Sequence, residues 1–179
     1  MFLKIRDKII NKFVLDNEIN TFVVFNSNLK NHFLYKKFLK HIGVKRRKWL
    51  LEELESGEES INVICFDLKT KKIIATRCFY QALHEDTYNI THEHIKSIKN
   101  EYKYFIGHKL VVSKQYRNKG YATKLVKELN NILFENEIDF ILGDSISKKA
   151  WKIYQKNGAI CVKENGKRKD YFYKNNLSI

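Results

Sequence analysis

The sequence has 179 residues, of which 44% are hydrophobic, 13% aromatic and 30% charged. This composition is typical of a folded globular protein rather than a disordered one, and the length predicts one domain, residues 1–179. No apolar run approaches the roughly 18 residues that cross a bilayer, and charges interrupt the N-terminal apolar stretch, so we expect a cytoplasmic protein without a signal peptide or membrane partner.

The net charge of +14 raises the question of a nucleic-acid surface. Most of the excess is lysine, and it is scattered apart from two clusters, at 45–48 and 163–174. A nucleic-acid reader would more often gather arginine and aromatic side chains on one face. Nucleic acid is therefore not the expected primary partner, although a basic RNA-binding protein stays an alternative.

The first half of the chain predicts strands on either side of two helices. Residues 1–20 fit either a short amphipathic helix or an edge strand, and both interpretations stay open. A β-branched, aromatic strand is predicted at 21–25, then helices over 29–41 and after Gly43. Two further strands, 60–68 and 72–81, flank a lysine-rich turn and predict a hairpin.

The polar segment 83–102 is expected to form a loop and a short helix over the acceptor end of a site, and its histidines are not expected to bind a metal. The three cysteines lie in strand-like apolar stretches without metal-ligand spacing. We predict that Cys65, Cys78 and Cys161 are buried free thiols.

The stretch 107–123 carries the clearest functional signal. Leu110, Val111 and Val112 predict a strand buried on both faces. A basic glycine turn follows and opens into a helix whose apolar stripe comprises Tyr121, Leu125, Val126, Leu129, Ile132 and Leu133. The N–H groups of the first helical turn, from about Asn118 to Thr123, lack partners within the helix and favour an anion. Gly120 and Ala122 allow close approach, while Arg117 and Lys119 add charge.

A second strand and helix follow downstream. Residues 140–142 predict a buried strand, and Ser147 can cap a helix that runs to Asn157 and ends at Gly158. Within it Ala150, Tyr154 and Gly158 recur at a spacing of four. Strand-like segments at 160–163 and 170–173 complete the chain.

These two motifs resemble those of the Gcn5-related N-acetyltransferase (GNAT) superfamily. Arg117-x-x-Gly120-x-Ala122 is similar to its pyrophosphate-binding signature, and Ala150, Tyr154 and Gly158 to its second motif. Ser147 stands where asparagine is common, and Ala159 replaces the usual aromatic residue. The order of predicted elements is similar to that of the superfamily along nearly the whole chain.

The resemblance implies an α/β (α+β) fold with a mixed, mostly antiparallel central sheet, helices on both faces and two splayed parallel strands. It implies acetyl-CoA as co-substrate and no metal. The cofactor-binding residues that it implies are Leu110, Val111, Val112, Arg117, Asn118, Lys119, Gly120, Tyr121, Ala122, Thr123, Ser147, Ala150 and Tyr154.

Acetyl transfer to an amine needs a neutral nucleophile and a protonated leaving thiol. An alkylammonium is about 99.9% protonated at pH 7, so its deprotonation costs about 4 kcal/mol and needs a base. His108 is the candidate base, alone or through water; vertebrate arylalkylamine acetyltransferases have a histidine at the corresponding place. Tyr154 is the candidate acid for the CoA thiolate, and a backbone N–H of the splayed strand, such as that of Val111, is the candidate oxyanion donor. A packed strand histidine and a core tyrosine are the alternatives.

Segment 31–39 resembles an invertebrate arylalkylamine N-acetyltransferase segment, although Lys37 and Phe38 stand where Glu and Pro would be. The sequence therefore predicts an N-acetyltransferase acting on a small-molecule amine or on a peptide or protein amino group. A catalytically inert acetyl-CoA-binding member is the second alternative, and the oligomeric state stays open.

Overall fold

The computed structural model describes residues 12–16, 19–55, 60–80 and 88–176. The chain forms two compact units, residues 1–80 with 109–122, and residues 81–108 with 123–179. Strand β5 (Tyr104–Val112) and helix α6 (Tyr121–Glu135) pass from one unit to the other. Among the described residues, no helix has the length and hydropathy that crossing a membrane requires.

The sheet of the first unit is antiparallel and follows the chain order. Strands β1 (Lys12–Asp16), β2 (Ile19–Phe25), β3 (Ser60–Asp67) and β4 (Lys72–Tyr80) pair in sequence, which confirms the predicted hairpin. The end of β5 lies beside β4, where the Ser113 N–H donates to the Ile74 carbonyl at 2.8 Å. Of segment 1–20, residues 1–11 and 17–18 lie outside the described residues, 12–16 form β1, and 19–20 begin β2.

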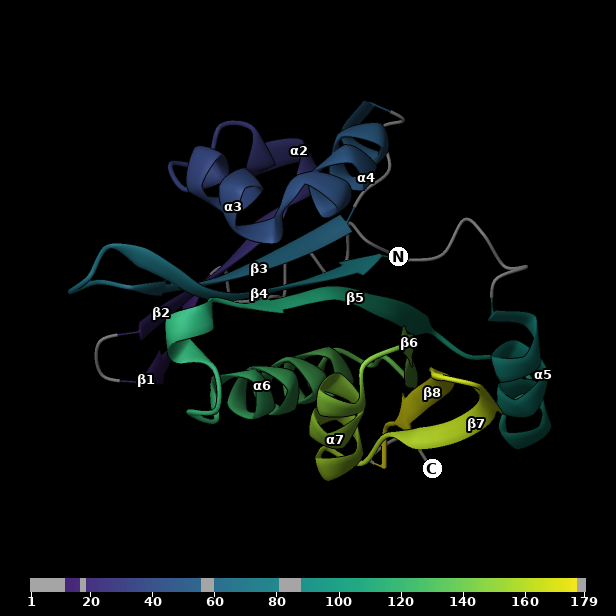
Figure 1. Ribbon diagram of the computed structural model, residues 1–179. Coiled ribbons are helices and arrows are strands. Elements are labelled where there is room, and N and C mark those ends of the chain that lie inside the picture. Colours follow the sequence, from purple (N-terminus) through teal and green to yellow (C-terminus); the bar gives the residue numbers. More distant parts are fainter. Residues whose placement is uncertain (1–11, 17–18, 56–59, 81–87, 177–179) are drawn as a thin grey trace. The chain divides into compact units, whose positions relative to one another are not determined.

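Helices α2 (Asn26–Leu29), α3 (Tyr35–Ile42) and α4 (Val44–Glu55) belong to the same unit (Figure 1). Their fully buried Leu29, Phe38 and Leu50 pack with Ile64 and Cys78 of the sheet. Each such side chain contributes roughly 1.5–3 kcal/mol through burial. The predicted helix over 29–41 was wrong at its start, because residues 30–34 turn between α2 and α3.

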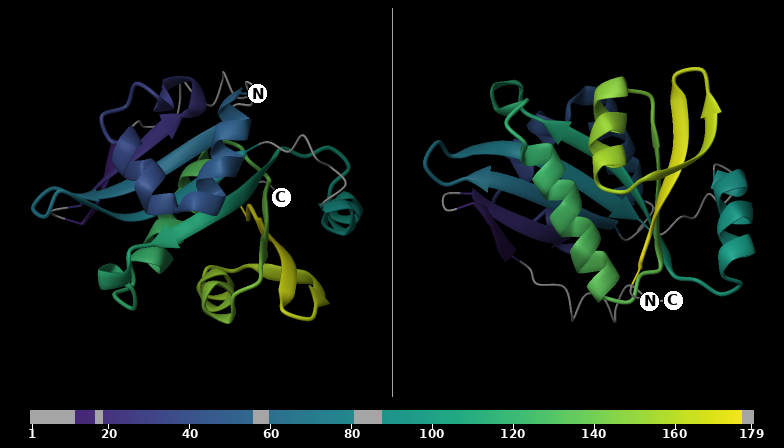
Figure 2. Two further views of the ribbon diagram at one scale, coloured as in Figure 1. Left: turned by 45° about the horizontal axis from the view of Figure 1, so that its top comes forward. Right: turned by 90° about the horizontal axis from the view of Figure 1, so that it is seen from below.

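In the second unit the sheet is mixed. β5 pairs in parallel with β6 (Phe140–Ser145), β6 pairs antiparallel with β8 (Arg168–Lys174), and β8 pairs antiparallel with β7 (Ile160–Asn165). The parallel pair and the antiparallel majority confirm the expected fold class. Figure 2 shows α6, α7 (Lys148–Lys156) and the β7–β8 hairpin of this unit.

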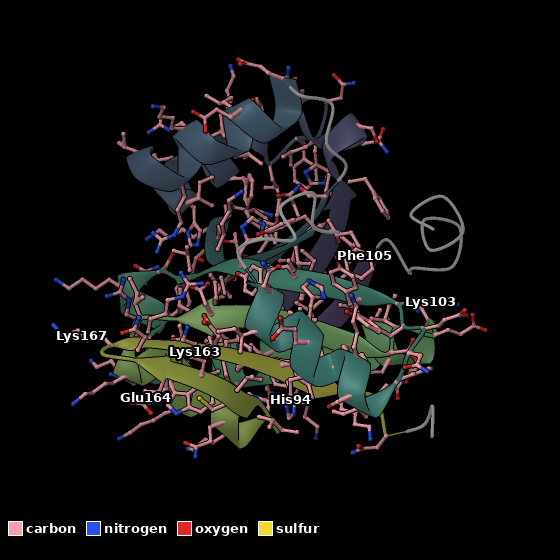
Figure 3. All side chains as sticks on the ribbon, turned by 90° about the vertical axis from the view of Figure 1, so that its right-hand side faces the viewer. His94, Lys103, Phe105, Lys163, Glu164 and Lys167 are labelled. Carbon is pink, nitrogen blue, oxygen red and sulfur yellow. The ribbon has the colours of Figure 1, made fainter. Side chains whose placement is uncertain are left out.

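Helix α5 (Asn89–Ile98) contacts β7 and β8, and its neighbour segment 81–87 lies outside the described residues. His94 of α5 has its ring centroid 5.6 Å from that of Phe172 (Figure 3). His92 of the same helix lies with Nδ1 2.7 Å from the Tyr102 hydroxyl oxygen. No cluster of metal-ligating side chains occurs in the described part of the chain, and His84 lies outside it.

Two burial predictions were wrong. Leu110, Val111 and Val112 are half-buried rather than buried on both faces; the buried residues of β5 are 105–107 and Lys109. Cys161 is exposed, because it lies on β7, where most side chains face solvent. Cys65 and Cys78 are buried free thiols as predicted, and burial raises the pKa of Cys65 to about 12.

Gly143 permits the close approach of β8 to β6. It pairs with Tyr171, and a Cβ at Gly143 would lie 2.6 Å from the Tyr171 hydroxyl oxygen and 3.1 Å from the Gly107 carbonyl oxygen. The first distance is too short for a methyl group, and the second is tight. Nothing in the sequence around Gly143 indicates this requirement, because the tyrosine lies 28 positions further on.

We expect Gly143→Ala to destabilise the protein by about 2–3 kcal/mol, because the new methyl group forces a buried tyrosine or strand to shift. Gly166→Ala is the control: its φ of 57° disfavours alanine by about 1 kcal/mol, but no atom lies within 4 Å of its Cβ position. Urea unfolding measures both losses. Equal losses in the two variants would show that the Tyr171 contact does not constrain this strand.

Candidate active site

The predicted phosphate turn lies in the first unit and has the backbone of an anion cradle. A short 3-10 helix at Lys114–Tyr116 leads into it, Asn118 and Gly120 have φ of 62° and 82°, and α6 begins at Tyr121. Residues 117–120 are exposed and Ala122 is buried. Nothing lies within 4 Å of a Cβ position at Gly120, so its positive φ, rather than space, favours glycine there. The turn presents the start of α6 to solvent, where N–H groups can bind an anion.

A partly buried hydrogen-bond network fixes the turn to the β3–β4 hairpin. The Tyr116 hydroxyl donates to Asp67 Oδ2 at 2.9 Å and lies 2.9 Å from Thr70 Oγ1. Asp67 Oδ1 accepts from the N–H groups of Lys69 and Thr70 at 2.8 and 2.9 Å. These bonds, the Thr70 N–H first among them, lower the pKa of Asp67 below its usual 3.8. The Lys119 ammonium lies 5.7 Å from the Tyr116 ring centroid, so the same tyrosine also packs beneath the turn.

The backbone of β5 shows which of its edges is open. The Val111 carbonyl lies 3.3 Å from His41 Nε2, and the Ser113 N–H donates to β4. Alternate residues of a strand face the same edge, so the N–H and C=O groups of Leu110 and Val112 face the other edge. The Val112 carbonyl there accepts from Arg117 Nε at 3.0 Å. The half-buried Leu110–Val112 stretch therefore offers strand-like hydrogen bonds next to the turn.

His41 is a contact that the sequence did not reveal. Its Nδ1 lies 3.2 Å from Ser113 Oγ, whose single proton goes to the Ile73 carbonyl at 2.7 Å. Burial lowers the pKa of His41, and its Nε2 faces the Val111 carbonyl. No sequence spacing could show this contact, because His41 and Val111 are 70 positions apart.

The second unit carries the other predicted site residues. Its parallel register ends at the pair Ile106–Leu142, although β6 continues to Ser145 alongside β8. Half-buried His108 lies two residues beyond the last parallel pair. The next residue, Lys109, has a φ of 54°, which interrupts the regular strand at the point where β5 enters the other unit.

Helix α7 has the local structure that the second motif predicted. Ser147 is its N-cap, and its side chain accepts from the Ala150 N–H at 3.4 Å. The Ala159 N–H returns to the Tyr154 carbonyl at 3.1 Å, and Gly158 has a φ of 84°. Tyr154 is buried, with its ring centroid 4.8 Å from that of Tyr171 at 32°. The second unit thus contains α7, with Ser147, Ala150 and Tyr154, and also Thr123 of α6. The other predicted cofactor residues, within 110–122, belong to the first unit.

A family model described as "Acetyltransferase (GNAT) family" matches residues 34–159, which include the turn, His108 and α7. The chain belongs to the GNAT acetyltransferase family. No curated protein matches the sequence significantly.

Solved acetyltransferases have the same fold. A ribosomal-protein-S5-alanine acetyltransferase from Vibrio fischeri has a TM-score of 0.59 at 13% identity, covering 92% of this chain and 97% of its own. The mosquito arylalkylamine N-acetyltransferase like 5b has a TM-score of 0.57 at 14% identity, covering 85% and 99%. The dodecameric spermidine N-acetyltransferase of Vibrio cholerae has a TM-score of 0.54 at 11% identity, covering 92% and 100%. Acetyl transfer is thus the activity of the family, and the GNAT fold of this chain confirms the resemblance.

The lowered pKa of Asp67 predicts a specific pH dependence for this GNAT protein. A carboxyl group whose folded pKa is depressed stabilises the fold above its unfolded pKa, near 3.8, and loses this contribution as pH falls through the lower folded value. Asp67→Asn should therefore cost about 1–2 kcal/mol at pH 7 and progressively less as the pH falls below 3.8.

Urea unfolding between pH 2 and 7 tests this, with Glu128→Gln as the control because Glu128 is exposed on α6. The control should match the wild type at every pH. A loss in Asp67→Asn that is as large at pH 2 as at pH 7 would contradict the assigned role of the carboxylate.

Proposed function

We propose that this protein is an N-acetyltransferase that transfers the acetyl group of acetyl-CoA to a primary amine by direct attack. The observation that carries the proposal is the arrangement in the first unit, where an exposed turn with two positive φ values opens α6 next to the free edge of β5. The family model supports acetyl transfer in general, and acetyl-CoA is its typical donor. We also propose a cytoplasmic location, with a small-molecule amine or a peptide or protein amino group as partner.

The turn would hold the pyrophosphate, and the strand edge would hold the pantetheine arm. Arg117 and Lys119 supply positive charge, and residues 118–123 supply N–H groups at the start of α6. The Leu110 backbone groups and the Val112 N–H face the open edge and can pair with the amides of the arm, while the Val112 carbonyl already accepts from Arg117. Val111 faces His41 instead, so we assign the oxyanion donor to the N–H of Leu110 or Val112 rather than to that of Val111.

The reaction needs two catalytic proton transfers. The ammonium form of the acceptor loses one proton to His108, directly or through water, and the neutral nitrogen then bonds to the thioester carbonyl carbon. As the carbon–sulfur bond breaks, the CoA sulfur takes a proton from the Tyr154 phenol, and the second proton of the nitrogen leaves through solvent and restores that phenol. A phenol with a reference pKa near 10 can protonate a thiolate whose conjugate acid is near 8.5. The products are the N-acetylated amine and CoA.

We do not expect α3 to bind a cationic acceptor through an acidic side chain. Lys37 is exposed on that helix, and its ammonium donates to the Lys71 carbonyl at 3.0 Å, so this segment is positively charged. Similar structures are called arylalkylamine, spermidine and ribosomal-protein-alanine acetyltransferases, which supports a panel of amines, polyamines and N-terminal peptides as acceptors.

Release of CoA from acetyl-CoA in the presence of this panel tests the proposal. With the best acceptor at saturation, Tyr154→Phe should lower kcat about 100-fold while the KM for acetyl-CoA changes less than threefold, because a general acid acts in the chemical step. Tyr35→Phe is the control. Tyr35 packs against the hydrophobic core that contains Phe38 and Leu50, and the proposed mechanism gives it no role.

An unchanged kcat in Tyr154→Phe would remove this tyrosine from the mechanism. Acetyl-CoA binding with no turnover on any acceptor would favour the inert alternative over the enzyme. His108→Gln separates the two proposed proton transfers: if His108 is the base, this variant loses rate most strongly at neutral pH and recovers it as pH rises and the amine deprotonates in solution.

A further inference from the structure

The first unit contains a second basic surface, separate from the phosphate turn. A groove of about 870 Å³ lies among α3, the β3–β4 turn and the segment that follows β5. Five lysines line it, here called the lysine groove: Lys37, Lys40, Lys71, Lys72 and Lys114. Its volume is that of a small-ligand site.

The lysine groove has no neutralising charge among the residues that the structure describes. None of its five lysines forms an ion pair with a described carboxylate, and no described acidic residue lines the groove. The nearest acid of the hairpin turn, Asp67, is held by Tyr116 and two N–H groups. Five like charges around one groove repel one another, and a polyanion would relieve that repulsion.

The walls of the groove are held in place by hydrogen bonds. Lys37 of α3 donates to the Lys71 carbonyl, and Ser113 bridges His41 and the Ile73 carbonyl. Lys71 has a φ of 56°, an unfavourable conformation for a lysine. The groove also presents neutral hydrogen-bonding groups at His41, Ser113 and Gln115.

We propose that the lysine groove binds a small polyphosphate, free or as part of a nucleoside polyphosphate. Lysine ammonium groups bind phosphate oxygens as point charges, and several of them match a chain of linked phosphates. No Phe, Tyr or Trp is among the described residues that line the groove, which disfavours single-stranded nucleic acid, whose bases stack on aromatic rings. Lys114 and Gln115, which lie just before the proposed acetyl-CoA turn, line the groove, whereas Arg117 and Lys119 do not, so the groove adjoins the turn without sharing those two basic residues.

Calorimetric titration with inorganic tripolyphosphate, ATP and a single-stranded RNA oligonucleotide tests the proposal. We expect one tripolyphosphate site whose affinity falls with salt. Lys40→Glu/Lys72→Glu should weaken it at least tenfold. The control pair Lys30→Glu/Lys167→Glu makes the same change in net charge at exposed lysines outside the groove, one of them on the β7–β8 turn (Figure 3), and should change it less than twofold.

Lys71→Gly provides a variant that cannot fail through misfolding of the turn. Glycine relieves the positive φ, so the melting temperature should stay or rise while tripolyphosphate affinity falls. Comparable affinities for tripolyphosphate and ATP would identify the phosphate chain as the ligand, and tighter ATP binding would identify a nucleoside polyphosphate.

Three results would overturn the proposal. If the groove double variant and the control double variant lost the same tripolyphosphate affinity, the effect would come from net charge alone. Competition by CoA, with loss of tripolyphosphate binding in Arg117→Glu, would assign the phosphate to the acetyl-CoA turn. RNA binding in place of tripolyphosphate binding would make the basic surface a nucleic-acid site.

Discussion

The parallel pairing of β5 with β6 ends at Ile106 and Leu142, and the site depends on where the β5 backbone finds partners beyond that point. A strand cannot leave its polar groups buried and unpaired. The structure pairs one edge of the following stretch with β4 and His41, through the Ser113 N–H and the Val111 carbonyl. The other edge keeps Leu110 and Val112 half-buried. In the proposed function, this interrupted edge would hold the pantetheine arm next to the start of a helix.

The turn that follows this edge is exposed and has a positive φ at Asn118 and Gly120. Its own side chains pack little, so contacts from neighbouring residues must hold it in place. Tyr116 gives that support from one side by joining Asp67 and Thr70 of the hairpin. Arg117 gives it from the other by donating to Val112. Charge and geometry therefore reinforce each other: the carboxylate stays ionised beneath the turn, and the exposed groups above it stay available for an anion.

Local periodicity and short-range capping made much of this predictable. The stripe of α6, the β3–β4 hairpin, the Ser147 cap and the glycine end of α7 follow from residues close together in the sequence. The partial exposure of residues 110–112 in β5 could not be predicted in this way. An apolar run looks the same in the sequence whether or not the neighbouring strand continues to pair beside it. The contact of His41 with Val111, the fit of Tyr171 over Gly143 and the exposure of Cys161 depend on residues tens of positions apart or on the place of a strand in the sheet.

The measurement that tests the central claim most directly is the melting temperature with and without acetyl-CoA, because it needs no acceptor. A hundredfold excess over Kd adds about 2.7 kcal/mol, which for a chain of this size is roughly 5–10 °C. The account predicts this shift for the wild type and a much smaller one for Arg117→Glu, whose melting temperature without ligand should be nearly unchanged. No shift at millimolar acetyl-CoA, or an equal shift in both proteins, would contradict the assignment of the turn and strand edge as the cofactor site.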